Sequence, residues 1–241
     1  MRTLVISDIH ANLNAFKAVL ADAGSVDQVW FLGDLVGYGP DPDECIELLR
    51  NLPNLLALMG NHDAALMEYI PIDRFNLEAA DAIKVQAGLI NQNSREFLEL
   101  LKLRIDSDNL TIVHGSPRNP IWEYILGPSN ARENFKHFES QGCLVGHSHV
   151  PVIFIQKKNG SIETLLPKHG DRWKADGRFI LNPGSVGQPR DFDPRASYVI
   201  WDDEEQTWGF YRVEYDITGV QDRIMKLGIP PRQATRLRTG T

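Results

Sequence analysis

The sequence predicts a single α/β domain, with mixed β-sheets and helices on their outer faces. In the first half, short apolar runs alternate with segments of helical periodicity, a pattern typical of βαβ units. In the second half, short apolar runs follow one another with turns between them, which predicts antiparallel strands. The 241 residues contain no internal repeat and no low-complexity linker. We therefore expect one domain over residues 1–241.

The first half begins with an apolar run over residues 3–7, which predicts a buried strand. Apolar spacing then predicts a helix from Leu13 that ends at Gly24. Another helix is predicted to start at residue 41. Asp41 is a capping residue, Pro42 stands at the first helical position, and Glu44 follows three residues after the cap. The remaining segments are predicted as strands over 28–32, 54–59, 110–113 and 143–145, and as helices over 77–91 and 96–101.

In the second half, Asn159-Gly160 separates two apolar runs, 152–158 and 161–166, and predicts a tight hairpin. Further strands are expected over 179–181, 196–201 and 208–213, the last after an acidic turn at 202–205. The chain after Pro230-Pro231 is predicted to be helical, so we expect a helical appendage at about 218–241.

Composition excludes several classes of protein. Hydrophobic residues make up 42% of the chain and charged residues 24%, which is ordinary for a globular protein. No apolar run approaches the roughly 20 residues that span a bilayer, and the N-terminal run is too short for a secretion signal. Cys45 and Cys143 are the only cysteines, which excludes a disulfide scaffold and a thiolate zinc site. We expect a cytoplasmic protein without a membrane partner.

The formal net charge of −7 argues against a sequence-independent nucleic-acid binder, which needs a broad basic face. One segment departs from this balance, because residues 218–241 carry five basic side chains against Asp222 alone. We interpret this segment as a solvated helical face.

Polar and metal-binding residue types follow five of the predicted strands. In open α/β sheets, ligands bind at the carboxyl ends of the strands, so these residues are expected on one rim. Carboxylates, an amide and imidazoles without a thiolate form a mixed nitrogen and oxygen set, too large for one tetrahedral zinc but suited to two ions that share a carboxylate. The candidate ligands are Asp8, His10, Asp34, Asn61, His114, His147 and His149.

The order and spacing of these motifs resemble the calcineurin-like metallophosphoesterases. The resemblance rests on Asp8-x-His10, Gly33-Asp34, Gly60-Asn61-His62-Asp63, His114 and Gly146-His147-x-His149. Further segments, 33–40, 114–117 and 182–190, resemble a small bacterial and archaeal phosphodiesterase-like branch of that family. The resemblance implies a four-layer αββα sandwich with two mixed sheets and a dinuclear centre of divalent transition metals. Manganese is the ion we expect, with iron, nickel or zinc as alternatives.

The resemblance also implies a role for each candidate ligand and for His62 and Asp63. Asp8, His10 and His149 would hold one metal; Asn61, His114 and His147 would hold the other, with Asp34 as the bridge. His62 would face the substrate as a catalytic residue, either protonating or steadying the leaving group, with Asp63 orienting it.

Asn12 either binds a phosphate oxygen or caps the following helix, and Arg190 either clamps phosphate or forms a surface ion pair. Arg118 and Arg195 are weaker phosphate-binding candidates. Tyr38, Trp122 and Tyr124 either stack on a base or pack internally.

The predicted function is hydrolysis of phosphate esters, as a phosphodiesterase or phosphatase, by a hydroxide that bridges the metals. The expected substrate is a small phosphate ester, possibly a nucleotide, and not long nucleic acid. The alternative is a non-catalytic scaffold of the same fold that binds a protein partner. A nuclease is disfavoured by the acidic balance and the short chain. The sequence leaves the oligomeric state open.

Overall fold

Two six-stranded mixed sheets form the centre of the computed structural model, which describes residues 1–241. The first sheet has the strand order β3-β2-β1-β11-β12-β9, and the second has the order β4-β5-β6-β10-β7-β8. The strands are β1 (Arg2–Ile6), β2 (Gln28–Phe31), β3 (Leu56–Ala57), β4 (Arg104–Asp106), β5 (Leu110–Val113), β6 (Gly142–Leu144), β7 (Pro151–Gln156), β8 (Ile162–Leu165), β9 (Arg172–Trp173), β10 (Arg178–Pro183), β11 (Ala196–Asp202) and β12 (Thr207–Val213).

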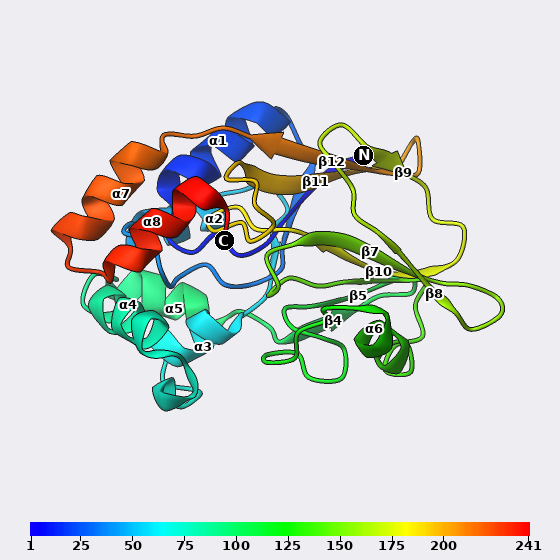
Figure 1. The fold of residues 1–241 in the computed structure, drawn as a ribbon, viewed down its shortest axis with the longest axis horizontal. Helices are drawn as coiled ribbons and strands as arrows, with labels where there is room; N and C mark the ends of the chain where they lie inside the picture. Colours follow the sequence, from blue (N-terminus) through cyan, green and yellow to red (C-terminus); the bar gives the residue numbers. More distant parts are fainter.

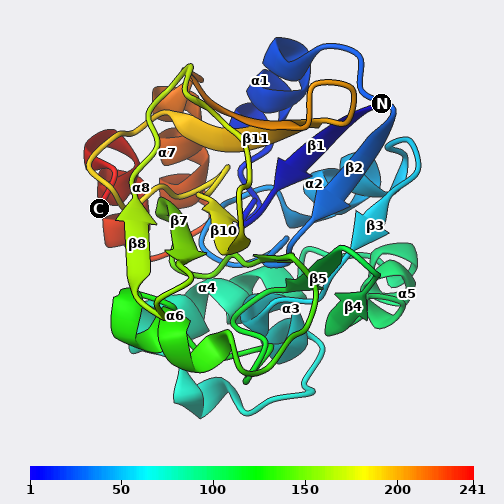
Figure 2. The same cartoon turned by 90° about the vertical axis from the view of Figure 1, so that its right-hand side faces the viewer.

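Eight α-helices and one 3₁₀ turn surround the sheets (Figures 1 and 2). They are α1 (Leu13–Ala23), α2 (Pro42–Arg50), α3 (Asn61–Leu66), η1 (Ile72–Arg74), α4 (Leu77–Ala87), α5 (Gln92–Glu99), α6 (Pro128–Asn134), α7 (Ile217–Lys226) and α8 (Pro231–Thr239). None of these helices has the length and apolar character that a membrane crossing requires.

Three apolar layers hold the sandwich together, and they confirm the predicted αββα arrangement. Residues such as Val5 and Phe179 fill the space between the two sheets. Phe16 and Ile46 on α1 and α2 pack against the outer face of the first sheet. Ala131 on α6 packs against the outer face of the second sheet, and Figure 1 shows α1 and α6 on opposite sides of the molecule.

Parallel pairing brings the key strand ends together. β1 pairs in parallel with β2, and β2 with β3, so all three end at the same edge of the first sheet. β5 pairs in parallel with β6, and β6 with β10, in the second sheet. The loops after these strands therefore meet where the two sheets face each other, as the rule for open α/β sheets predicts.

Several predicted boundaries differ from the structure. The strand expected over 54–59 is only Leu56–Ala57, and the helix expected over 77–91 ends at Ala87. The helix expected over 96–101 spans Gln92–Glu99, because Asn91 caps it by accepting a hydrogen bond from Ser94 N–H at 3.0 Å. The C-terminal appendage contains two helices, α7 and α8, which pack on α4 through a small apolar cluster of their own.

Candidate metal centre

The predicted ligands converge on the loops that follow five strands. Asp8 and His10 follow β1, Asp34 follows β2, and His114 follows β5. The remaining three come after β6 or begin α3: His147, His149 and Asn61. All seven residues are buried, with no more than 3% of any of them exposed.

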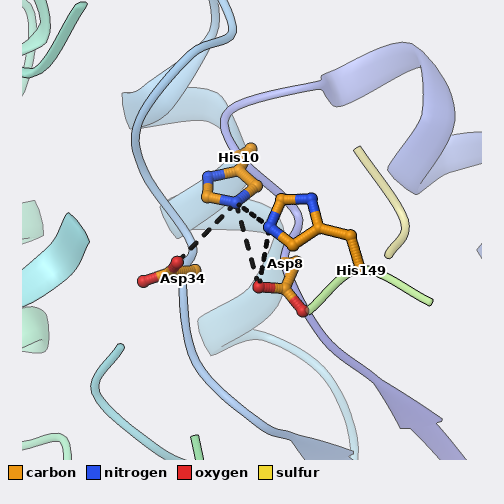
Figure 3. A group of neighbouring side chains, drawn as sticks. All are labelled: Asp8, His10, Asp34 and His149. Carbon is orange, nitrogen blue, oxygen red and sulfur yellow. Dashed lines mark hydrogen bonds and ion pairs between the residues drawn. The ribbon is translucent and has the colours of Figure 1, made fainter. Parts of the chain in front are cut away.

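Asp8, His10, Asp34 and His149 form one cluster, in which one ligand atom from each residue lies within 4.8 Å of the others. His149 Nε2 lies 3.3 Å from Asp8 Oδ1, and His10 Nε2 lies 3.7 Å from Asp34 Oδ2. Figure 3 shows the two imidazoles facing each other beside the carboxylates, with 3.1 Å between their Nε2 atoms.

A second cluster shares Asp34 and contains His114 and His147. His114 Nε2 lies 3.3 Å from Asp34 Oδ2 and 3.2 Å from His147 Nδ1. Asn61 Oδ1 is 3.1 Å from the same His114 nitrogen. Asp34 is the only residue common to both clusters, and its Oδ2 atom has no hydrogen-bond partner. The arrangement therefore brings together the groupings that the sequence predicted.

The hydrogen bonds of three histidines determine which ring nitrogen faces the site. A backbone carbonyl can only accept, so a ring nitrogen that contacts one must carry the proton. His10 Nδ1 donates to the Val36 carbonyl at 2.8 Å, and His149 Nδ1 donates to the Gln188 carbonyl at 2.6 Å. His114 Nδ1 donates to the Leu32 carbonyl at 3.0 Å. The Nε2 atoms of all three rings therefore point inward, and those of the neutral His10 and His149, which carry lone pairs, face each other at 3.1 Å. A cation between these lone pairs removes their repulsion, so the donor set fits metal ions.

Burial controls the charge of the site. It lowers the pKa of His10, His147 and His149 well below the usual histidine value, so these imidazoles are neutral and able to bind metal. Burial also raises the pKa of Asp8 to about 7. For Asp34 the effect of burial is outweighed by the nearby histidines, His114 above all, and its pKa falls far below the usual range. Asp34 therefore supplies a negative charge between the two clusters.

Five of the seven ligand residues have backbones in the left-handed region, where L-residues are strained. The φ angles are +54°, +47°, +60°, +66° and +61° at Asp8, His10, Asp34, His147 and His149. Gly33 has a φ of +100°, which only glycine adopts readily. The chain thus turns sharply after β1, β2 and β6, and these turns point the ligand side chains into the site.

Asp63 has a different role from the predicted one. Its carboxylate accepts hydrogen bonds from the backbone N–H groups of four residues, at 2.9–3.0 Å, and none from the His62 ring. The donors are Asp34, Leu35, Val36 and Gly60. Asp63 therefore holds the loop that carries Asp34, and it is a positioning residue.

His62 lies inside the site with a ring that has no hydrogen bond at Nδ1. Its ring centroid is 4.5 Å from that of Tyr38, 4.8 Å from that of His10 and 5.0 Å from that of Phe75. Burial lowers the pKa of His62 to about 4, so the ring is neutral at neutral pH. Of the two predicted roles, the neutral His62 ring favours steadying the leaving group over donating a proton from an imidazolium.

Asn12 is a helix cap in the structure. Its Oδ1 accepts from Ala15 N–H at 3.1 Å at the start of α1, and its Nδ2 donates to the Gly187 carbonyl at 2.9 Å. Both polar atoms of the side chain are thus engaged and the residue is buried. The structure therefore places Asn12 in the capping role of the two that the sequence left open.

Arg190 lies at the edge of the site and forms no ion pair with a carboxylate. Its Nη2 donates to Gln188 Oε1 at 2.9 Å and to Tyr38 Oη at 3.3 Å, while its Nε is buried without a partner. The two weaker arginine candidates differ, because Arg118 pairs with Glu123 and Arg195 with Asp193. Of the three, Arg190 alone has its charge available to a phosphate.

Of the predicted aromatic residues, Tyr38 packs between histidines and Trp122 packs on Phe75, with centroids 5.0 Å apart. Tyr124 stacks on the His147 ring at 3.8 Å between centroids. Sequence reasoning missed Gln188, whose carbonyl fixes the His149 tautomer. A backbone contact of this kind leaves no mark on residue type, so no sequence signal pointed to it.

Residues 1–206 match the family profile of the calcineurin-like phosphoesterase superfamily domain. The chain belongs to the calcineurin-like metallophosphoesterase superfamily. This membership agrees with the buried histidine and aspartate clusters, and it makes the chain a phosphoric ester hydrolase by family.

Individual relatives of this metallophosphoesterase match over different lengths. A solved metallophosphoesterase from Sphaerobacter thermophilus is 43% identical, with a TM-score of 0.92 and coverage of 100% of this chain and 99% of that one. An uncharacterized protein from Methanocaldococcus jannaschii is 38% identical over 98% of this chain and 97% of its own length. A symmetrical bis(5'-nucleosyl)-tetraphosphatase from Pectobacterium atrosepticum is 31% identical over 55% of this chain, and the match spans about half (49%) of that enzyme.

Proposed function

We propose that this metallophosphoesterase hydrolyses a small nucleotide phosphate ester at a centre of two divalent transition-metal ions, with manganese as the working ion. The observation that carries the proposal is the inward direction of the Nε2 atoms of His10, His114 and His149 around the shared Asp34 carboxylate. The similarity to a bis(5'-nucleosyl)-tetraphosphatase over 55% of the chain supports a nucleotide substrate.

The proposed ligand sets follow the two clusters. Asp8, His10 and His149 would hold one ion, and His114, His147 and Asn61 the other, with Asp34 shared. When bound, two such ions supply Lewis-acid stabilisation of the phosphoryl oxygens and lower the pKa of water. Negative charge on Asp8 and Asp34 offsets the charge of the ions.

Residues of the chain itself would orient the ester. Arg190, whose guanidinium has no carboxylate partner, would bind a non-bridging phosphoryl oxygen. His62 would donate a hydrogen bond from its neutral ring to the leaving oxygen, held in place by packing against Tyr38 and Phe75. Tyr124, which stacks on His147 and is 41% exposed, would border the substrate as well.

A cytoplasmic location and a small substrate complete the proposal. The net charge of −7 offers no broad basic surface for the backbone of long nucleic acid. Efficient, strongly salt-dependent digestion of long DNA would contradict this part of the proposal, since phosphate-backbone binding weakens steeply with salt.

The experiment combines metal analysis with turnover. Protein reconstituted with manganese is expected to hold two ions per chain and to cleave bis(4-nitrophenyl) phosphate, and a chelator is expected to abolish the reaction. His137→Ala is the matched control for loss of a histidine, because His137 is exposed and lies outside both clusters. Active protein with one ion or fewer would refute the dinuclear centre. Fully metallated protein that is inert toward every phosphate ester, nucleotides included, would favour the scaffold function.

A further inference from the structure

Two buried amides connect Arg190 to a carboxylate on α4. Arg190 Nη2 donates to Gln188 Oε1 at 2.9 Å, and Gln188 Nε2 donates to Gln233 Oε1 on α8 at 3.0 Å. Gln233 Nε2 in turn donates to Glu78 Oε2 through a long hydrogen bond of 3.4 Å. Gln188 and Gln233 are each only 1% exposed, so water does not compete for these contacts. We call these four side chains the Arg190–Glu78 network.

The two ends of the network fix the direction of both amides. A guanidinium only donates hydrogen bonds, and a carboxylate only accepts them. Arg190 therefore requires the oxygen of the Gln188 amide, which leaves the Gln188 NH2 group for Gln233. Gln233 must then present its oxygen to Gln188 and its NH2 group to Glu78. A flip of either amide would bring two donors or two acceptors together, so only one arrangement satisfies the network.

The network runs from the loop over residues 184–195 to α8 and then to α4. Helix α8 packs on α4 and α7 through an apolar cluster, and Figure 1 shows the three helices together at one end of the molecule. A second contact joins α8 to the same loop, because Phe192 N–H donates to the Gly240 carbonyl at 2.8 Å. Gln233 is therefore held against Gln188 by contacts that do not involve the metal centre.

The other partner of Arg190 is also fixed by a buried glutamine. Arg190 Nη2 donates to Tyr38 Oη at 3.3 Å. The backbone on both sides of Tyr38 is held by Gln86 of α4, which accepts from Gly37 N–H and donates to the Gly39 carbonyl, both at 2.6 Å. The guanidinium of Arg190 thus has two oriented partners, and neither of them carries a negative charge.

We propose that Gln233 is a positioning residue, which acts through the Gln188 amide to hold Arg190 where it binds the phosphoryl group; this rests on the proposed function, which assigns that role to Arg190. A carboxylate at position 188 would pair with Arg190 directly and compete with phosphate. The network instead connects Arg190 to Glu78 without bringing the two charges into contact. The C-terminal helix α8 thereby contributes to phosphate binding without touching the substrate.

The first experiment measures the binding of inorganic phosphate to the manganese-loaded protein by calorimetry. Gln233→Leu keeps the bulk of the side chain but interrupts the network, and it is expected to weaken phosphate binding about tenfold because Arg190 loses its fixed direction. In an Arg190→Gln background the same substitution is expected to have no further effect, since Gln233 acts only through Arg190. Equal losses in the two backgrounds would overturn the proposal.

An exchange of charge tests the direction of the network. Gln233→Glu places a second carboxylate beside Glu78 with no proton between them, and it is expected to weaken phosphate binding as Gln233→Leu does. Adding Glu78→Gln restores a donor at this contact and the net charge of the protein, so the double variant is expected to recover an affinity within about threefold of wild type. A double variant that binds phosphate no better than Gln233→Glu would contradict the proposed order of donors and acceptors.

Gln221→Leu is the matched control. Gln221 is a half-buried residue of α7 that donates to the Ala234 carbonyl of α8 at 2.6 Å and lies outside the Arg190–Glu78 network. Like Gln233→Leu, it is expected to lower the free energy of unfolding in urea, but it is expected to bind phosphate as wild type does. An equal loss of phosphate affinity in both variants would mean that Gln233 has a structural role alone.

A readout that needs neither metal nor turnover is the exchange of the Arg190 Nε–H proton with solvent. It is followed by NMR in the metal-free protein, where the signal is identified by its absence in Arg190→Lys. This nitrogen is buried, and its proton is expected to exchange at least about tenfold faster in Gln233→Leu than in wild type. Equal exchange rates would overturn the positioning role. Failure of wild type to cleave any phosphate ester would instead refute the proposed function, and the exchange rates would still decide whether Gln233 positions Arg190.

Discussion

Replacement of Asn12 offers a direct test of the contact between α1 and the loop at Gly187. Asn12→Ala removes the cap of α1, which is worth about 1 kcal/mol. It also leaves the buried Gly187 carbonyl without the Asn12 Nδ2 donor at 2.9 Å, at a cost of about 1–3 kcal/mol. We expect the free energy of unfolding to fall by about 2–4 kcal/mol in total. Asn12→Ser, which restores a capping oxygen, should recover about 1 kcal/mol.

The assay is urea denaturation, accompanied by KM for a phosphate ester. Asn76→Ala is the matched control, because Asn76 caps α4 through Ala79 N–H at 3.0 Å but is exposed and makes no second contact. It should lose only about 1 kcal/mol. If Asn12→Ala is no less stable than Asn76→Ala while KM rises tenfold or more, Asn12 is a phosphate ligand and the capping assignment is wrong.

Three further predictions concern the metal centre. Asp34→Asn should reduce the metal content of both positions, because the residue belongs to both clusters. His10→Ala should reduce the metal content of mainly one position. Elemental analysis that shows equal losses in the two variants would contradict the shared position of Asp34. His62→Ala should lower turnover by about 10²–10³-fold for esters with poor leaving groups, since one hydrogen-bond donor to the leaving oxygen is lost, with metal content unchanged and a smaller effect for acidic leaving groups. Full activity of that variant toward a poor leaving group would remove its catalytic role. Asp63→Asn should weaken metal binding by about 10–100-fold in a competition titration, since two of the four N–H groups lose their acceptor; an unchanged affinity would show that the Asp34 loop holds its shape without them.

The residues at the strand ends could be predicted because their chemistry and order appear directly in the sequence. Apolar runs located β1 and β5, and the polar residues after them had to lie on the rim of the sheets. Helix α3 was missed, because Asn61, His62 and Asp63 are polar and the helix has only six residues. Without an apolar stripe, a short helix has no periodic signal.

The role of Asp63 was unpredictable for a different reason. Its partners are backbone N–H groups, and every residue except proline carries one, so the sequence gives no sign of them. The charge of His62 likewise depends on burial, which only the folded chain establishes. The two uses of Asn12 were distinguishable only once the Gly187 carbonyl was located.

The left-handed backbone at five ligand residues has a consequence for the life of the protein in a cell. Each such residue costs about 1 kcal/mol, and glycine, which would relieve the cost, has no side chain to bind metal. Ions that bind only the folded chain offset this cost by mass action. Because small changes in stability alter how much of a protein escapes proteolysis, we expect the abundance of this chain to follow the supply of its metal. Metal starvation would then act twice, by emptying the site and by shortening the lifetime of the chain that carries it.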